Sequence, residues 1–136
     1  MAKFEWVSKY EDCGLALPVR KTEHSAGYDL AAAKDIIIPS YASQMAALTN
    51  EWVGNSTFLP SVALTLNDMA MLTKSSKAKP TLVSTGLKCK LDPGTYLELS
   101  VRSSTPLKYW LILANGVGII DADYYNNVDN EGEIFL

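Results

Sequence analysis

A succession of short stretches of alternating hydrophobicity, each closed by a turn signal, most constrains the fold of this chain. Between residues 3 and 10 apolar and polar side chains alternate, which places Phe4, Trp6 and Tyr10 on the inward face of a strand and Val7 on the outward face. Further strands are expected over residues 27–33, 36–38, 81–91, 95–102 and 111–120. Many short strands separated by turns are typical of an all-β barrel or sandwich.

One pair of these strands has an explicit turn between its members. Asp92-Pro93-Gly94 separates residues 81–91 from residues 95–102, and this spacing predicts an antiparallel hairpin. Within the second strand the alternate residues from Leu97 to Val101 are apolar and fall on one face. The apolar run over 111–120 is broken by Asn115-Gly116.

Residues 41–79 interrupt the strand pattern. Tyr41, Met45, Leu48 and Trp52 follow one another at spacings of 4, 3 and 4, which predicts one face of a helix. A capping pattern over 65–68 predicts a second, short helix. We expect a helical insertion in a β domain, and the simplest interpretation of its apolar stripe is core packing.

Composition narrows the class of protein. The chain has 136 residues, which suits one domain, and 12 Lys plus Arg against 15 Asp plus Glu give a net charge of −3. That balance argues against a broad basic surface for nucleic acid but allows a small local phosphate site. No apolar run approaches the ~20 residues of a membrane span. The first residues carry no apolar signal core, so a cytoplasmic location is expected.

The cysteines and the histidine exclude several site types. Cys13 and Cys89 are far apart in sequence and are expected to be reduced and buried. With His24 they are too few for a structural zinc site, and His24 lies in a polar stretch typical of a solvated loop. No Gly-x-Ser-x-Gly pattern is present. Any acid–base chemistry is therefore expected to fall to carboxylates.

Three clusters of residues could carry chemistry: the first cluster (25–30), the second cluster (101–104) and the third cluster (115–124). In the second cluster, Arg102, Ser103 and Ser104 offer a guanidinium fork and two hydroxyls, which suit phosphate oxygens. For an isolated Arg-Ser-Ser the simpler and favoured interpretation is a solvated strand end.

The third cluster combines polar groups with glycines in an apolar run. The amide of Asn115 can pair with a base edge, and Gly116 and Gly118 let a flat ligand approach the backbone. Asp121 follows a buried strand and could hold and polarise a water, while Tyr124 could stack on a sugar or base. The alternative is an ordinary β-turn at Asp-Ala-Asp.

In this order the three clusters resemble motifs 1, 2 and 3 of the trimeric dUTP pyrophosphatases (dUTPases). Residues 26–30 match Ala-Gly-x-Asp-Leu, residues 102–104 match Arg-Ser-Ser, and residues 115–124 match Asn, five residues, then Asp-x-Asp-Tyr. The insertion and the Asn-Gly-Val-Gly at 115–118 are most similar to the phage and Gram-positive branch. The resemblance implies a jelly-roll-like β barrel, mainly β, with residues 1–136 forming a single domain around a short helical insertion at 41–79.

The resemblance also implies an activity: hydrolysis of dUTP to dUMP and pyrophosphate, which keeps uracil out of DNA and supplies dUMP. Asp121 would activate the water that attacks the α-phosphorus. Asn115, with the backbone at Gly116 and Gly118, would pair with uracil in a pocket too narrow for the methyl group of thymine. Tyr124 would pack under the deoxyribose and reject a 2′-hydroxyl.

The remaining implied roles concern the phosphates and their metal ion. Arg102, Ser103 and Ser104 would contact the phosphates, and Asp29 would support the site. Mg²⁺ would be held mainly by the triphosphate, with Asp29 contributing through water rather than as a direct ligand. The family forms homotrimers in which motif 2 of one subunit meets motif 3 of its neighbour. No membrane and no stable nucleic-acid partner are implied, and the location would be the host cytoplasm if the gene belongs to a phage.

The chain departs from the family pattern at several places. Asn126 and Asn127 stand where the family usually has Gly-Glu, and Val101 stands where Pro is frequent. Motifs 4 and 5 would follow Leu136, so the sequence is expected to be shortened at that end. Two alternatives stay open: a dCTP deaminase-like enzyme of the same fold, and a nucleotide-binding or protein-interaction module that uses 41–79 as a partner surface.

Overall fold

The computed structural model describes residues 2–40, 43–44 and 79–136. The chain divides into two compact units, one formed by 1–36 with 82–136 and the other by Ile37–Thr81. In the second unit the backbone N–H of Ser43 donates to Ser40 Oγ at 3.1 Å, a contact typical of a helix N-cap. The two predicted helices of the insertion fall almost wholly on residues outside the described part.

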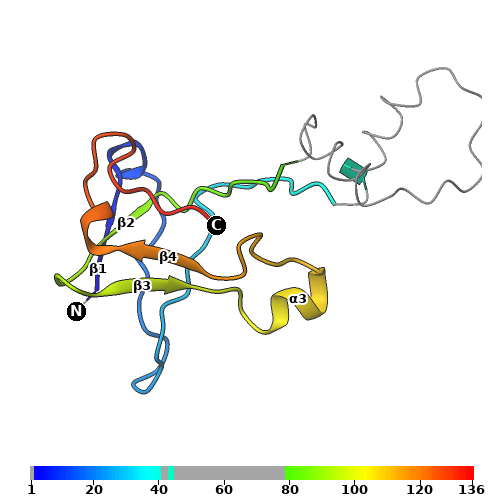
Figure 1. Cartoon of the computed structure of the whole chain (residues 1–136), viewed down its shortest axis with the longest axis horizontal. Coiled ribbons are helices and arrows are strands. Elements are labelled where there is room, and N and C mark those ends of the chain that lie inside the picture. The colour runs from blue at the N-terminus through cyan, green and yellow to red at the C-terminus, as the bar shows by residue number, and fades with distance from the viewer. Residues whose placement is uncertain (1, 41–42, 45–78) are drawn as a thin grey trace, which may run out of the picture. The chain divides into compact units, whose positions relative to one another are not determined.

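The first unit is mainly β and contains two small antiparallel sheets (Figure 1). Strand β1 (Lys3–Trp6) pairs with β2 (Leu87–Lys90). Strand β3 (Tyr96–Leu99) pairs with β4 (Gly118–Asp121), with Tyr96 opposite Asp121 and Leu99 opposite Gly118. The short helices are η1 (Ser8–Tyr10), α3 (Ser104–Tyr109) and η2 (Ala122–Tyr124).

The predicted hairpin around Asp92-Pro93-Gly94 is wrong in its pairing. The turn itself forms, because Thr95 N–H donates to Asp92 O at 3.2 Å and Gly94 has a φ of +77°. Its two flanking strands then separate, since β2 pairs with β1 and β3 pairs with β4. Alternation predicts which face of a strand is buried, but the choice of partner depends on the packing of the whole core.

Several strand boundaries also differ from prediction. The structure places no strand over residues 27–33 or 36–38, and the apolar run at 111–120 becomes a strand only at Gly118. The helix α3 lies between the expected strands 95–102 and 111–120, where no element was predicted, and it ends at Trp110 in a left-handed conformation. Val7, predicted to face outward, is only 2% exposed, because β1 ends at Trp6 and η1 changes the direction of the chain.

The core of the first unit lies between the two sheets and the C-terminal segment. Phe4, Cys89, Leu99 and Ile134 form one buried cluster, and Ile134 is 0% exposed. The segment around Ile134 is fixed by the backbone, since Ile134 N–H donates to Leu87 O at 2.8 Å. Hydrophobic burial therefore packs β1, β2 and β3 against the C-terminal segment around Ile134.

The cysteine and histidine predictions agree with this packing in most respects. Cys89 is buried and Cys13 half-buried, and both thiols are free. Burial raises the pKa of the Cys89 thiol because it disfavours the thiolate. His24 is exposed, as expected for a loop residue.

Within the first unit, a hydrogen bond joins the segment that precedes the second unit to the segment that follows it. Ala33 N–H donates to Ser84 O at 2.9 Å, just before the chain leaves the unit after residue 36 and just after it re-enters at residue 82. Ser84 also forms an antiparallel β-bridge with Phe135. The residues around Ser84 are therefore part of the backbone hydrogen bonding of the first unit.

The loop from residue 125 to residue 133 is held by asparagine side chains. Asn126 has a φ of +58°, the left-handed conformation that asparagine tolerates better than most residues. Asn127 Oδ1 accepts from the backbone N–H groups of Asp129 and Asn130, both at 3.0 Å, and Asn127 Nδ2 donates to Tyr124 O at 2.9 Å. The two asparagines at the positions of the family's Gly-Glu thus form the turn themselves.

A carboxylate joins this loop to the N-terminal segment. Glu131 accepts hydrogen bonds from the backbone N–H of Ser8 at 3.1 Å and from the Ser8 hydroxyl, and Lys88 Nζ lies 3.3 Å from the same carboxylate. The Ser8 hydroxyl, followed by the Ser8 N–H and Lys88, lowers the pKa of Glu131 below its ordinary value of 4.5.

The Glu131 contact predicts an acid-dependent stability. Because the folded-state pKa is lowered, the contact stabilises the fold above pH 4.5 and this contribution is lost as pH falls through the folded pKa. We expect Glu131→Gln to lower the thermal midpoint at pH 7. At a pH below both the ordinary pKa of 4.5 and the lowered pKa of the folded state, we expect the thermal midpoint to be unchanged. Glu98→Gln, on the exposed side of β3, is the control and should show no such pH-dependent difference. A constant difference at all pH values would contradict the prediction.

Candidate functional site

The first and second clusters share one pocket of about 290 Å³. It is lined by residues of the segments 21–29 and 100–102, namely Lys21, Ser25, Gly27, Tyr28, Asp29, Ser100, Val101 and Arg102. The structure therefore brings together two of the predicted site residues, Asp29 and Arg102, which are far apart in sequence. Arg102 Nη1 lies 3.5 Å from Asp29 Oδ2.

The Asp29–Arg102 pair is open to solvent. The Arg102 side chain is 74% exposed and the Asp29 side chain 40% exposed. An exposed ion pair of this kind contributes about 0–1 kcal/mol, so little free energy is lost when the guanidinium leaves the carboxylate. Arg102 can therefore turn toward an anionic ligand at little cost in free energy.

The wall of the pocket is anchored to the core through Tyr28. The Tyr28 ring packs edge-to-face on Phe4, with centroids 5.1 Å apart and an interplanar angle of 65°. The Arg20 guanidinium lies 5.7 Å from the centroid of the same Tyr28 ring. Lys21 and Arg102 line the pocket and Arg20 stands beside it, so cations outnumber the single carboxylate Asp29. This charge favours an anion despite the chain's net charge of −3.

The two serines of the second cluster lie at the start of α3, directly after the pocket residue Arg102. Ser103 is exposed and Ser104 is half-buried. The chain turns here because Thr105 N–H donates to Arg102 O at 2.8 Å. Neither serine lines the pocket, although both adjoin Arg102 in the chain.

The third cluster begins with a tight turn ahead of β4. Gly116 has a φ of +76°, which only glycine adopts readily, and its N–H donates to Leu113 O at 3.0 Å. Asn115 is exposed beside it. A Cβ added at Gly118 would lie 3.1 Å from Leu99 Cβ, so close packing between β3 and β4 accounts for the second glycine.

The two remaining site residues lie at the far end of β4. Asp121 is exposed at the last position of the strand, and Tyr124 is half-buried at the end of η2. The Tyr124 hydroxyl donates to Glu133 O at 3.1 Å and accepts from Asn130 Nδ2 at 2.8 Å. This tyrosine is therefore held by the loop that follows it.

Within one chain Asp121 and Arg102 lie toward opposite ends of the β3–β4 ladder. The two strands run in opposite directions (Figure 1), so their C-terminal ends lie at opposite ends of the pair. Asp121 is opposite Tyr96, whereas Arg102 follows Leu99 at the other end of β3. The ladder between these rows is about 10 Å long, since a strand advances about 3.3 Å per residue. The first two clusters therefore form a pocket together, while Asp121 and Tyr124 stand apart from it.

Several pocket residues were not predicted from the sequence. Lys21, Tyr28 and Ser100 line the pocket but were not among the predicted site residues. The turn closed by Ser25 N–H to Thr22 O at 3.2 Å lies between Lys21 and the first cluster. No spacing signal in the polar stretch 21–25 marks it as part of a site. Among the described residues no group of three or more His, Cys, Asp or Glu side chains could hold a metal ion.

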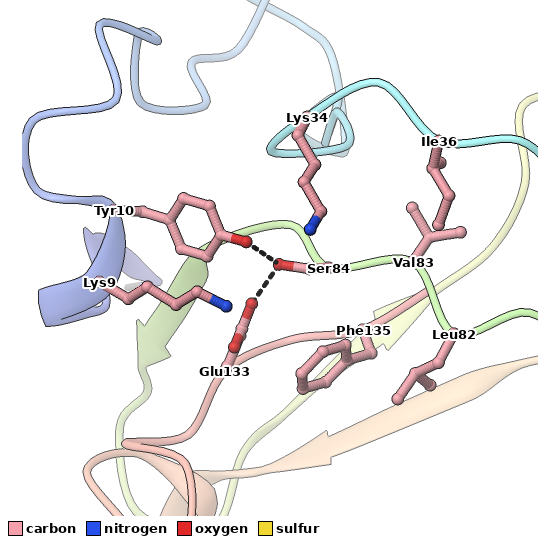
Figure 2. A pocket seen from close by; sticks show the side chains of 9 residues that line it. All are labelled: Lys9, Tyr10, Lys34, Ile36, Leu82, Val83, Ser84, Glu133 and Phe135. Carbon is pink, nitrogen blue, oxygen red and sulfur yellow. Dashed lines mark hydrogen bonds between the residues drawn. The ribbon is translucent and has the colours of Figure 1, made fainter.

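A second pocket of about 230 Å³ lies near the C-terminal segment and contains none of the predicted site residues. Figure 2 shows the Tyr10, Ser84 and Glu133 side chains meeting there. The Ser84 hydroxyl donates to the Glu133 carboxylate, and the Tyr10 hydroxyl lies 3.2 Å from Ser84 Oγ. Since the one Ser84 hydrogen is used toward Glu133, Ser84 accepts from Tyr10.

The fold and the first pocket together define an antiparallel β protein with a cationic pocket built from a loop and the end of a strand. The chain is 37% identical over 133 residues to a deoxyuridine 5'-triphosphate nucleotidohydrolase of Lactococcus lactis subsp. lactis (strain IL1403), an alignment that covers 98% of this chain. It also matches the crystal structure of dUTPase from Streptococcus mutans, with 34% identity, a TM-score of 0.61, and coverage of 97% of this chain and 73% of that one. The chain belongs to the dUTPase family.

These alignments cover almost all of this chain but only part of each relative. It spans 64% of the length of the Lactococcus lactis protein. No family model matches the chain. Within the part of the chain that the structure describes, no helix has the length and apolar character needed to cross a membrane.

Proposed function

We propose that the protein hydrolyses dUTP to dUMP and pyrophosphate. The observation that carries the proposal is the cationic pocket that joins the first and second clusters, in a chain of the dUTPase family. A triphosphate is a polyanion, and Lys21 and Arg102 present cationic donors at this pocket. The biological result would be removal of dUTP, which keeps uracil out of DNA, and supply of dUMP.

In the proposed reaction Asp121 acts as general base. Its carboxylate orients a water molecule and takes a proton from it as the water oxygen bonds to the α-phosphorus. The bond between the α-phosphorus and the bridging oxygen breaks, and pyrophosphate leaves with that bonding electron pair. The exposed position of Asp121 at the end of β4 supports this role, because substrate and water can both reach it.

Base and sugar recognition would use the rest of the third cluster. Asn115 would pair with uracil, together with the backbone at Gly116 and Gly118. Gly116 supports this assignment because a Cβ there would meet nothing within 4 Å, so the turn is open to a ligand. Tyr124 would pack under the deoxyribose with its half-buried ring.

Phosphate recognition would use the second cluster. Arg102 would form charge-assisted hydrogen bonds with the phosphate oxygens, and Ser103 and Ser104 would add neutral donors. Asp29 would direct the guanidinium, which lies 3.5 Å from it in the structure. The reaction would then depend on positioning and on stabilisation of developing negative charge.

Mg²⁺ fits this arrangement as a partner of the triphosphate. The ion prefers oxygen ligands and keeps several waters, and the described residues offer no protein cage of three or more ligands. Asp29 would hold it through water, since its carboxylate lines the pocket and is 40% exposed. When bound, the ion would neutralise phosphate charge and polarise the α-phosphate.

The active unit would be a homotrimer with sites between subunits, built on residues 1–136 as one domain with 41–79 as an insertion. The separation of Asp121 from Arg102 along the β3–β4 ladder supports this assembly, because a neighbouring chain could supply the missing half. Exposed apolar side chains near α3 also support it, with Trp110 92% exposed. We place the protein in the cytoplasm.

Nucleotide hydrolysis tests the proposed function directly. With Mg²⁺ present we expect pyrophosphate and dUMP to be released from dUTP, with much slower release from dTTP, dCTP and UTP. Removing the metal with a chelator should lower the rate by about tenfold or more. Release of ammonia from dCTP would favour the deaminase alternative. Binding of dUMP without turnover of dUTP would favour a nucleotide-binding module.

A further inference from the structure

The hydroxyl of Tyr124 is held from two sides by its own chain. Asn130 Nδ2 donates to Tyr124 Oη at 2.8 Å, and Tyr124 Oη donates to Glu133 O at 3.1 Å. The phenol hydrogen is therefore already used, and one lone pair of the oxygen is occupied. Two directional bonds at the tip of a half-buried ring fix its position more closely than packing alone.

The Asn130 amide has a defined orientation. Its Oδ1 accepts from Gly132 N–H at 3.0 Å, which leaves Nδ2 to face Tyr124. The backbone N–H of Asn130 donates to Asn127 Oδ1, also at 3.0 Å. Asn130 is therefore fixed at both its backbone and its side chain, and the group that holds Tyr124 does not itself rotate freely.

The acceptor on the other side of Tyr124 is fixed as well. Glu133 is buried, and its backbone N–H donates to Asn130 O at 3.0 Å. Its carboxylate accepts from Ser84, which in turn lies 3.2 Å from the Tyr10 hydroxyl (Figure 2). The Glu133 carbonyl that receives the Tyr124 hydrogen bond thus belongs to a residue held at both ends.

We propose that Asn130 is a positioning residue that holds the Tyr124 ring and thereby sets the discrimination between deoxyribose and ribose. The inference deepens the proposed function and rests on it, because it needs Tyr124 to lie against the sugar. A ring held at its hydroxyl cannot move aside for an added 2′-hydroxyl, whereas a released ring can. The Tyr124 hydroxyl also has no hydrogen left to offer a ribose.

The test is the ratio of kcat/KM for dUTP to kcat/KM for UTP. We expect Asn130→Ala to lower this ratio by about tenfold, the effect of losing one hydrogen bond, mainly through KM. The kcat for dUTP should change by only about twofold, since Asn130 touches no reacting atom. In a Tyr124→Phe background Asn130→Ala should cause no further fall, because the bond it removes is already absent.

Asn127→Ala is the matched control in the same loop. It removes hydrogen bonds to the backbone groups of Tyr124, Asp129 and Asn130 but leaves the Tyr124 hydroxyl bonded to Asn130. We expect it to lower the thermal midpoint at least as much as Asn130→Ala while keeping most of the sugar discrimination. An equal loss of discrimination in both variants, or a further loss in the double variant, would overturn the proposal.

Two further measurements keep the test decisive. If Asn130→Ala does not fold, Tyr124→Phe removes the same hydrogen bond from the other partner, and the same loss of discrimination is expected. If the parent protein does not hydrolyse dUTP, the proposed function fails, and calorimetry with dUMP and UMP then tests Asn130 by itself. Equal dUMP-to-UMP affinity ratios in parent and variant would refute the positioning role.

Discussion

Replacing Asp121 with Asn is expected to lower the turnover of dUTP by about a thousandfold, the usual contribution of a general base. The substitution keeps the size of the side chain and its place at the exposed end of β4. It removes the basic oxygen that would take the proton from water, so kcat should fall while the affinity for dUMP stays nearly constant. The measurement is pyrophosphate release under single-turnover conditions, together with dUMP binding by calorimetry.

Asp123→Asn is the matched control for this experiment. Asp123 lies two residues further along, in η2, and is also exposed. Both substitutions remove one negative charge from the same short segment, so a general electrostatic effect would appear in both. Undiminished turnover in Asp121→Asn, or an equal loss in Asp123→Asn, would contradict water activation by Asp121.

Gly132→Ala is expected to destabilise the fold by about 3 kcal/mol or more, and by more than Gly94→Ala. Gly132 has a φ of +82°, and an added Cβ would lie 2.5 Å from Tyr124 O and 2.9 Å from Tyr125 Cα. Both neighbours are backbone atoms, so relief would require the loop to move. Chemical denaturation in urea measures the loss as a lower midpoint.

Gly94→Ala separates the two causes of that loss. Gly94 has a similar φ of +77°, but an added Cβ there would meet nothing within 4 Å. We therefore expect about 1 kcal/mol for Gly94→Ala, the cost of the backbone conformation alone. Similar losses in both variants would show that the close contact at Gly132 relaxes without cost.

Local sequence pattern predicted those parts of the fold that depend on one segment. The alternation from Phe4 onward marked β1, and the apolar side chains of β3 turned inward, with Leu99 buried. The pattern could not choose strand partners, because β1 and β2 come from distant parts of the chain and pair to bury Cys89 and Phe4 together. Pairing of this kind depends on the whole core rather than on local propensity.

The helix α3 shows a different limit. Its apolar residues Leu107 and Tyr109, with Trp110 after it, stay exposed instead of forming a buried stripe. Helical periodicity is visible in a sequence only when one face is buried in the same chain, so the usual signal was missing. Pro106 in the first turn fits the helix, but a proline also fits a loop.

The candidate site also contains residues that the sequence predicted and residues that only the folded structure reveals. Asp29 and Arg102 were predicted as site residues from their motifs, and the structure brings them to one pocket. Lys21 lines the same pocket but belongs to a polar stretch with no recognisable spacing, so only the folded backbone reveals it. Asn130 is similar, since only the folded loop brings its side-chain amide to 2.8 Å from the Tyr124 hydroxyl.

The hydrogen bond between Ala33 and Ser84 affects how the length of this chain can change in evolution. Because the first unit is closed at the point where the chain leaves and returns, the length of the chain between residues 36 and 82 enters its stability mainly as the entropy of closing a loop. The entropy of closing such a loop grows only slowly with its length, by about 0.6 kcal/mol for each doubling. We therefore expect a change in the length of the segment 37–81 to cost the first unit little stability.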